Sequence, residues 1–145
     1  MTIRKLGRKK AHRERTLRNL ATSVVLHEKV RTTEAKAKAV APLVERLITR
    51  ARPNDIAGRR FAKSLLFDMN AVTKLFEDVA ARAGVRTSGF TRITKLVPRP
   101  GDNAPMAQLE ILYTSVEEVI AKQTKTKVKV TKTASASEPV AEETV

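Results

Sequence analysis

Apolar residues recur every three or four positions in four segments of the chain, which is the spacing of an amphipathic helix. The segments run from about Thr16 to Glu28, from Thr33 to Arg52, from Ile56 to Phe67 and from Asn70 to Gly84. The side chains expected in the core of these helices are Leu17, Leu20, Ala21, Val24, Val25, Val40, Val44, Leu47, Ile48, Ala51, Ile56, Phe61, Leu65, Leu66, Val72, Leu75, Phe76, Val79 and Ala80. The first part of the chain is therefore predicted to be helical.

Polar residues and glycine mark where these helices begin and end. Thr33 and Asn70 are predicted N-caps, because a side-chain oxygen there can accept a free backbone N–H of the first turn. The stretch 53–55, Pro-Asn-Asp, is predicted to stop one helix and cap the next. Gly84 is a natural terminator for the last helix. Pro42 lies inside the second helix and is expected to kink it or delay its start.

The apolar spacing changes to two further along the chain, which is typical of half-buried strands. Residues 91–97 and 107–113 alternate roughly between apolar and polar, and the segment between them is rich in proline. This pattern predicts a hairpin with a long, stiff loop. Because two strands alone are marginally stable, residues 29–32 are expected to join them, with the helices covering one face. The predicted fold class is α+β, with about four helices on a small sheet.

The character of the chain changes again after about residue 116. Residues 116–121 could extend a short helix, whereas 122–145 combine Lys-Thr and Lys-Val repeats with an Ala, Ser and Glu stretch. That composition buries too little apolar surface to offset chain entropy, so 122–145 are predicted to be disordered. Three regions result: an extended basic N-terminal arm, 1–15; an α+β domain, 16–115; and a C-terminal extension, 116–145, mostly disordered.

The distribution of charge along the chain indicates what class of ligand the protein binds. Lys and Arg number 29 against 15 Asp and Glu, for a net charge of +14. Residues 1–18 hold eight basic residues and one acid, and therefore half of the net charge, while residues 116–145 are balanced. A basic arm ahead of a nearly balanced body is typical of proteins that reach into a folded nucleic acid. A polyanionic partner is therefore expected.

Targeting and membrane segments are the other interpretations of a basic N-terminus. A secretory signal is disfavoured because no apolar run of the required length follows, and Gly7 with the Arg8-Lys9-Lys10 cluster would make a poor mitochondrial presequence. No segment approaches the roughly 20 apolar residues of a membrane span. The expectation is a soluble, cytoplasmic protein without a membrane partner.

Catalytic and cofactor chemistry finds little support in the composition. The chain has no Cys, its two His residues (His12 and His27) are isolated, and its five Gly form no phosphate loop. Glu77 and Asp78 fit a solvated helix face better than a catalytic pair. We therefore expect no metal, no cofactor and no enzymatic activity. Because aromatic residues make up only 3% of the chain, the composition also disfavours a protein that binds single strands mainly by stacking bases.

Three groups of residues remain as candidate nucleic-acid contacts. The arm offers point charges that can each neutralise a phosphate, against the alternative of a merely solubilising tail. The turn at 87–92 offers hydroxyls, a glycine and an arginine, although it also fits an ordinary loop whose Phe90 packs in the core. Arg99 stands on the stiff loop, while Arg59 and Arg60 are equally consistent with a solvated helix face. The predicted contacts are Arg4, Lys5, Arg8, Lys9, Lys10, His12, Arg13, Arg15, Arg18, Ser88, Gly89, Thr91, Arg92 and Arg99.

Several longer motifs make the prediction more specific. They are Leu6-Gly7-Arg8, Ala11-His12-Arg13, the stretch 17–23 (LRNLATS), His27-Glu28, the stretch 32–38 (TTEAKAK), Gly89-Phe90-Thr91-Arg92-Ile93 and the stretch 101–107 (GDNAPMA). In this order and spacing, over about residues 1–115, the chain resembles the bacterial large-subunit ribosomal protein L17 family.

The resemblance implies a structural protein that binds large-subunit ribosomal RNA near the exit of the peptide tunnel. It also implies an α+β domain with an extended basic N-terminus, one copy in the ribosome, and large-subunit proteins twenty-two and thirty-two as neighbours. Arg8, His12, Arg13, Arg18, Arg92 and Arg99 stand where the family's motifs place basic or RNA-facing groups. The extension beyond about Val116 departs from the short members of the family.

Two rival functions can be tested against the same residues. A nucleoid-type DNA-binding or chaperone-like protein is expected to show the heptad pattern of a dimer or an apolar wedge on a basic ribbon, and neither pattern occurs in the sequence. An RNA-modifying enzyme would need a cofactor loop or an acid–base cluster, which is also missing. A ribosomal RNA-binding protein is therefore the leading hypothesis.

Overall fold

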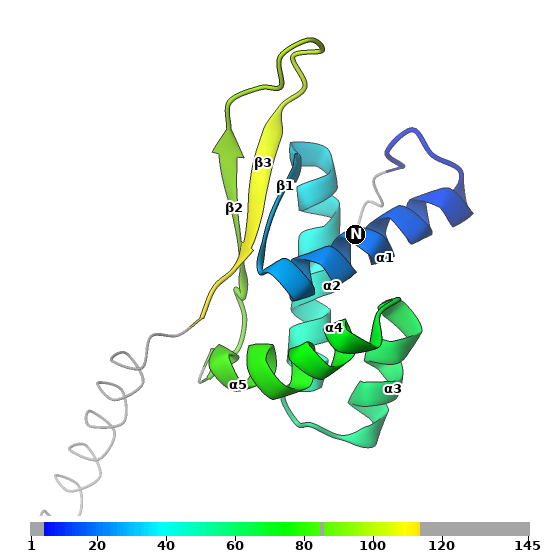
Figure 1. Ribbon diagram of the computed structural model, residues 1–145, viewed down its shortest axis with the longest axis vertical. Coiled ribbons are helices and arrows are strands. Elements are labelled where there is room, and N and C mark those ends of the chain that lie inside the picture. The colour runs from blue at the N-terminus through cyan, green and yellow to red at the C-terminus, as the bar shows by residue number, and fades with distance from the viewer. Residues whose placement is uncertain (1–4, 85, 114–145) are drawn as a thin grey trace, which may run out of the picture. The chain divides into compact units, whose positions relative to one another are not determined.

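The computed structural model describes residues 5–84 and 86–113, and it has the expected α+β architecture (Figure 1). The predicted contact Arg4 and the extension 116–145 lie outside the described residues. The helical elements are α1 (Lys10–His27), α2 (Glu34–Ala51), α3 (Ile56–Leu65), α4 (Met69–Lys74), the π-helical turn η1 (Leu75–Val79) and α5 (Ala80–Ala83). The strands are β1 (Lys29–Thr33), β2 (Thr91–Leu96) and β3 (Met106–Ile111).

The three strands form one antiparallel sheet in the order β1-β3-β2. The hairpin predicted from the alternating pattern is therefore present, and residues 29–33 pair with β3 on the side opposite β2. Val30, Leu109 and Ile93 lie side by side across the sheet and point to the same face. This register confirms the expectation that the short segment after the first helix completes the sheet.

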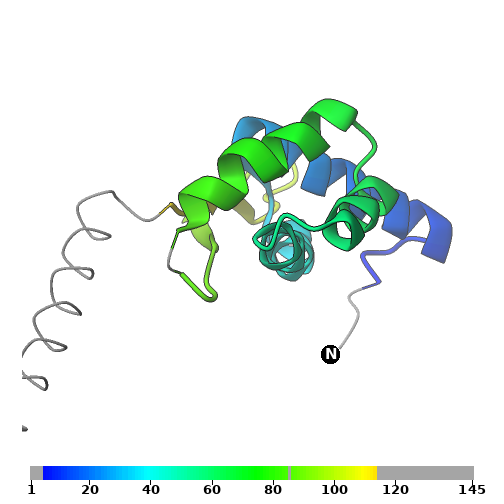
Figure 2. The same cartoon turned by 90° about the horizontal axis from the view of Figure 1, so that it is seen from below.

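The core lies between the sheet and the helices. Helix α2 runs against all three strands and also contacts α1, α3 and α5; in Figure 2 it is seen nearly end-on. Its Val40, Val44 and Ile48 are fully buried, as are Val24 and Val25 of α1. A single apolar face per element is enough to form this cluster, which is why the periodicity of the sequence predicted most of its members.

The first helix begins at Lys10, six residues before the predicted start at Thr16. Lys10–Arg15 consists mostly of good helix formers, but none of its residues is fully buried, and the first fully buried residue of α1 is Ala21. A prediction based on the regular spacing of buried apolar residues therefore missed residues 10–15. The segment from Lys10 to Arg15 is helical and not extended.

The second helix continues through Pro42 from Glu34 to Ala51, so the proline does not delay its start. A proline at this position removes the N–H that would bond to the carbonyl of Lys38. Thr33 occupies the N-cap position as predicted, although its side chain makes no capping hydrogen bond.

The third and fourth helices differ from the prediction at their ends. Asp55 caps α3, as predicted, and accepts a hydrogen bond from the N–H of Gly58 at 2.6 Å. Asp68, rather than Asn70, caps α4 and accepts from the N–H of Asn70 at 2.9 Å. Ile56 is 71% exposed, so its predicted place in the core is wrong: it is the first residue of α3 and faces solvent.

A network of charged side chains joins the end of α1 to the fourth helical segment. Glu28 has a φ of 63°, and its Oε1 lies 2.6 Å from Nη2 of Arg82 and 3.0 Å from Nζ of Lys74. Arg82 also pairs with Asp78, and its guanidinium lies 3.8 Å from the centre of the Tyr113 ring. The hydrogen bond from Arg82 is the main cause that lowers the pKa of Glu28 to about 2, desolvation opposes it and Lys74 adds to it.

Replacing Glu28 by glutamine is expected to lower the free energy of unfolding by about 1–2 kcal/mol at pH 7, after allowance for partial solvent screening. Since the pKa of Glu28 is lower in the folded chain than its ordinary 4.5, the stabilisation is complete above that pH and is lost as the pH falls towards 2. Urea unfolding followed by circular dichroism at several pH values measures the difference between variant and parent. Asp102→Asn is the matched control, because that carboxylate also has a pKa of about 2 but its ion pair is fully exposed. A constant difference between pH 7 and pH 2 would contradict the assigned role of Glu28.

Candidate nucleic-acid interface

The basic N-terminal segment forms a tight turn that leads into α1 (Figure 1). Leu6 and Gly7 have φ values of 55° and 60°, and the N–H of Arg8 donates to the carbonyl of Lys5 at 3.1 Å. Arg8 folds back on the turn, where its Nη1 donates to the carbonyl of Leu6 at 3.4 Å. Within the described residues its Nε is buried without a hydrogen-bond partner. Part of the Arg8 side chain therefore belongs to the turn itself.

The first half of α1 carries the largest group of predicted contacts. Lys10, His12 and Arg15 are exposed, and Arg13 and Arg18 are half-buried. In the part of the chain that the structure describes, no salt bridge involves any of these side chains. Their charges are therefore available to an external anion.

The start of α1 is electrostatically unfavourable for the protein alone. Lys9 occupies the N-cap position without a side-chain hydrogen bond, and the first turn holds no acidic residue. The positive end of the helix dipole thus meets more positive charge, at a cost of about 0.3–1 kcal/mol for each cation close to it. A bound phosphate would reverse the sign of these interactions. The arrangement therefore favours binding of an anion at this helix end.

The turn before β2 holds the second group. Ser88 and Gly89 are exposed, and the carbonyl of Gly89 accepts from Nη1 of Arg86 at 3.3 Å. Phe90 is 1% exposed, which confirms that it packs in the core. The hydroxyl of Thr91 donates to Oε1 of Glu45 at 3.0 Å, so it already has a partner within the protein.

Arg92 extends from β2 on the face of the sheet opposite the core. Its side chain is 62% exposed, and Nη1 lies 3.7 Å from Oε1 of Glu110 on the neighbouring strand. The loose pairing leaves most of the guanidinium in solvent. An RNA contact by Arg92 remains a prediction that this geometry permits.

The hairpin loop holds the last predicted contact, Arg99, in an ion pair. Its Nε and Nη2 donate to the two carboxylate oxygens of Asp102 at 3.1 and 2.6 Å, and this pairing is the main cause that lowers the pKa of Asp102 to about 2. The backbone N–H of Arg99 donates to the carbonyl of Ala104 at 3.0 Å. Arg99 therefore shapes the loop, and a contact with RNA would share a guanidinium already paired with Asp102.

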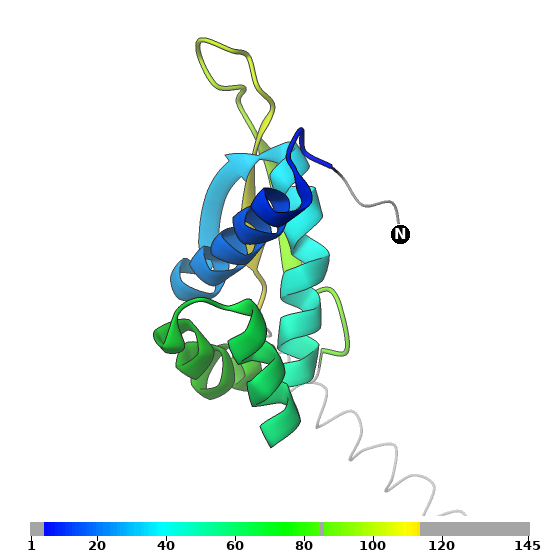
Figure 3. The same ribbon diagram turned by 90° about the vertical axis from the view of Figure 1, so that its right-hand side faces the viewer.

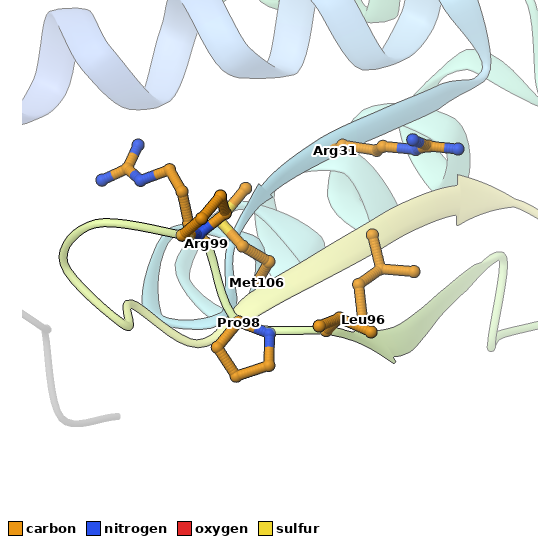
Figure 4. Close-up of a pocket in the computed structure, with 7 residues that line it drawn as sticks. Arg31, Leu96, Pro98, Arg99 and Met106 are labelled. Atoms are coloured by element: carbon orange, nitrogen blue, oxygen red, sulfur yellow. The ribbon is translucent and has the colours of Figure 1, made fainter.

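An open hollow of about 470 Å³ lies beside this loop, where the two hairpin strands meet it (Figure 4). Its lining is mainly apolar, from Leu96, Pro98 and Met106, and Arg31 and Arg99 lie at its two ends in Figure 4. Arg31 was not among the predicted contacts. It could have been found from its place in β1, where it alternates with the inward-facing Val30.

The predicted contacts do not form one site. The turn at 86–90 and the loop at 97–105 adjoin opposite ends of β2, which are about 17 Å apart at the rise of an extended strand. The first half of α1 projects away from the sheet on the other side of the molecule (Figures 1 and 3). The structure thus presents three separate basic places, of which the α1 region has the most unpaired cations.

Several further exposed cations were not predicted as contacts. They lie on α2, on α3 and just after α2, and include Arg46, Arg50, Arg52, Arg60 and Lys63. The sequence left Arg59 and Arg60 undecided; the guanidinium of Arg59 lies 5.0 Å from the centre of the Phe76 ring and therefore partly covers the core. The only sequence signal for this group is the polar face of each helix, which does not distinguish a binding surface from a solvated one.

Residues 5–84 and 86–113 show neither a metal site nor a membrane-spanning helix. No group of three or more His, Asp or Glu residues there is placed to hold a metal ion. No helix within these ranges has the length and apolar character needed to cross a membrane. The basic surfaces are therefore the candidate functional sites of the described residues.

Comparison with known proteins gives these surfaces a context. The family model described as ribosomal protein L17 matches residues 16–112. The large ribosomal subunit protein bL17 of Chlorobaculum tepidum is 44% identical over 128 residues, which cover 86% of this chain and 82% of the relative. The proteins of the same name from Desulfitobacterium hafniense and Natranaerobius thermophilus are 46% and 48% identical, each over 77% of this chain and 99% or more of the relative.

Proposed function

Because the chain belongs to the ribosomal protein L17 family, a structural component of the large ribosomal subunit, we propose that it binds large-subunit ribosomal RNA chiefly through the first half of α1. The observation that carries this proposal is the group of cations at the start of α1 that have no salt-bridge partner among the described residues. The first turn of that helix also contains no acidic residue. Each phosphate held there releases counterions and relieves repulsion within the protein.

The other two basic surfaces would recognise the shape of the RNA as well as its charge. Ser88 and Gly89 expose a hydroxyl and backbone groups that suit phosphate and ribose. The hairpin loop is held rigid by its ion pair and by three prolines, so it can enter a gap in folded RNA without losing much entropy on binding. The protein would thus contact RNA from more than one side.

The finer position in the subunit is also part of the proposal. Likeness to the family supports a place near the exit of the peptide tunnel, with large-subunit proteins twenty-two and thirty-two as neighbours and one copy of this chain per ribosome. Chemical cross-linking of intact subunits, read out by mass spectrometry, tests these neighbours directly. Cross-links only to other proteins would contradict this part of the proposal.

Membership of the family also settles the class of the protein. It is a ribosomal protein that takes part in translation in the cytoplasm, and it is not an enzyme. Under the proposal its role is to hold RNA in place, and the residues that matter are therefore those that present charge and shape to the RNA.

The binding proposal is tested with the full chain and two nucleic acids. Transcribed bacterial large-subunit ribosomal RNA is expected to bind at least ten times more tightly than duplex DNA of random sequence at 0.15 M salt, because shape as well as charge is recognised. Filter binding over a range of salt concentrations measures both affinities. Equal affinity for the two, together with failure to co-sediment with large subunits at moderate salt, would favour a nucleoid-type protein instead.

A further inference from the structure

The corner between α3 and α4 exposes two large apolar side chains. Phe67 and Met69 are each 57% exposed, whereas Leu66 beside them is buried. All five aromatic residues of the chain lie within the described ranges, and Phe67 is the one among them that is exposed. Phe76 and Phe90 are in the core, while Phe61 and Tyr113 pack against it. The ring of Phe67 is therefore not needed for packing.

The backbone at this corner is nevertheless held in place. The N–H of Phe67 donates to the hydroxyl of Thr22 on α1 at 3.4 Å, and the N–H of Leu66 donates to the carbonyl of Ala62 at 2.8 Å. On the other side, the carboxylate of Asp68 accepts from the N–H of Asn70. A ring on an anchored backbone loses little entropy when a ligand covers it, so the corner is preorganised.

The corner lies next to the basic half of α1. The hydroxyl of Thr22 that holds Phe67 also donates to the carbonyl of Arg18, one turn earlier on the helix, and Arg15 lies about one turn beyond that. Figures 1 and 3 show the α3–α4 corner beside α1, on the same side as its first half. Lys63 is exposed in the last turn of α3.

The acidic residues nearby do not cancel this charge. The carboxylate of Asp68, which caps α4, contributes one negative charge, against the three cations of Arg15, Arg18 and Lys63. Glu14 is the single acid in the first half of α1, among Lys10, Arg13, Arg15 and Arg18. An exposed aromatic ring therefore stands in a surface that is positive overall.

We propose that Phe67, with Met69 beside it, is a stacking platform for one unpaired base of the RNA, whose neighbouring phosphates contact Arg15, Arg18 and Lys63. This inference rests on the RNA binding proposed above. A nucleotide supplies both a flat π-face for the ring and an anion for the surrounding cations. An apolar protein surface would cover the ring only by taking those cations out of water, which is costly. The thioether of Met69 adds a polarizable contact at the edge of the base.

The test compares full-length variants on transcribed bacterial large-subunit ribosomal RNA. Phe67→Ala is expected to weaken binding by about 5- to 100-fold, the range found when a stacking aromatic is removed. Phe67→Tyr keeps the ring and is expected to bind as the parent does. Ile56→Ala is the matched control, because Ile56 is another exposed apolar side chain at a helix end, and it should leave binding unchanged.

The dependence of affinity on salt separates stacking from charge. Loss of stacking should lower the affinity of Phe67→Ala by the same factor at every salt concentration, whereas Arg18→Gln should reduce the slope by about 0.7–0.9. Chemical probing of the bound RNA should show one unpaired base that is protected by the parent and by Phe67→Tyr but not by Phe67→Ala.

Three results would contradict the proposal that Phe67 stacks on an RNA base. The first is unchanged RNA affinity and base protection in Phe67→Ala. The second is full affinity in a further variant, Phe67→Leu, which keeps an apolar side chain but no ring. The third is a defect of Phe67→Ala confined to cross-linking with a neighbouring ribosomal protein. The last of these would identify the corner as a protein-docking surface. If the parent protein does not bind the RNA, the proposed function itself is wrong. If the parent binds and Phe67→Ala binds equally well, only the stacking proposal is wrong.

Discussion

Replacing Lys10, Arg13 and Arg15 together by glutamine is expected to weaken binding to large-subunit ribosomal RNA by about 100- to 500-fold at 0.1 M salt. The three side chains lie in the first half of α1 and have no salt-bridge partner within the described residues. If each neutralises one phosphate, each contributes a factor of roughly 5 to 8 at this salt concentration, and the slope of log affinity against log salt falls by about two to three. Filter binding between 0.05 and 0.3 M salt measures both quantities.

Stability distinguishes this effect from unfolding. Removal of cations near a helix N-terminus relieves repulsion with the dipole, so the triple variant should melt at the same temperature as the parent or slightly higher. The control with the same change in charge is Arg46→Gln, Arg52→Gln and Arg60→Gln, on exposed residues of α2, its end and α3. Equal losses for both triple variants would show that total charge, and not the start of α1, determines binding.

Replacing Phe90 by alanine is expected to lower the free energy of unfolding by about 3–5 kcal/mol, a large part of the total for a domain of this size. Phe90 is the largest of the fully buried side chains, at 1% exposure, and its carbonyl accepts from the N–H of Leu112 at 2.8 Å. The substitution leaves a cavity between the helices and the start of β2. Thermal and urea unfolding, followed by circular dichroism, measure the loss.

Phe67→Ala is the matched control for this prediction, because it removes the same ring from a site that is 57% exposed. Its effect on stability should stay within about 0.5 kcal/mol. Phe90→Leu should lie between the two, since it fills part of the space. A loss of less than 1 kcal/mol in Phe90→Ala would contradict the position of this residue in the core.

The pattern of the sequence predicted those parts of the fold in which burial repeats with a regular period. The apolar faces of α2 and of the fourth helical segment, the hairpin and the joining of residues 29–32 to the sheet all follow from local spacing. The same reasoning missed the start of α1 and misplaced Ile56, because neither Lys10–Arg15 nor a first-turn residue contributes to a buried face. The π-helical turn at Leu75–Val79 also has no periodic signal of its own.

For the site, the sequence by itself predicted a polyanionic partner and pointed to a ribosomal protein family, because charge content and motifs are local properties. Only the tertiary structure decided which cations are free. It paired Arg99 with Asp102 and used the hydroxyl of Thr91 on Glu45, while leaving the first half of α1 unpaired. It also left Phe67 exposed beside α1, a position for which the sequence pattern made no prediction. The reason is that contacts between residues distant in the chain, such as Thr22 and Phe67, depend on how the helices pack, and spacing along one helix carries no information about this.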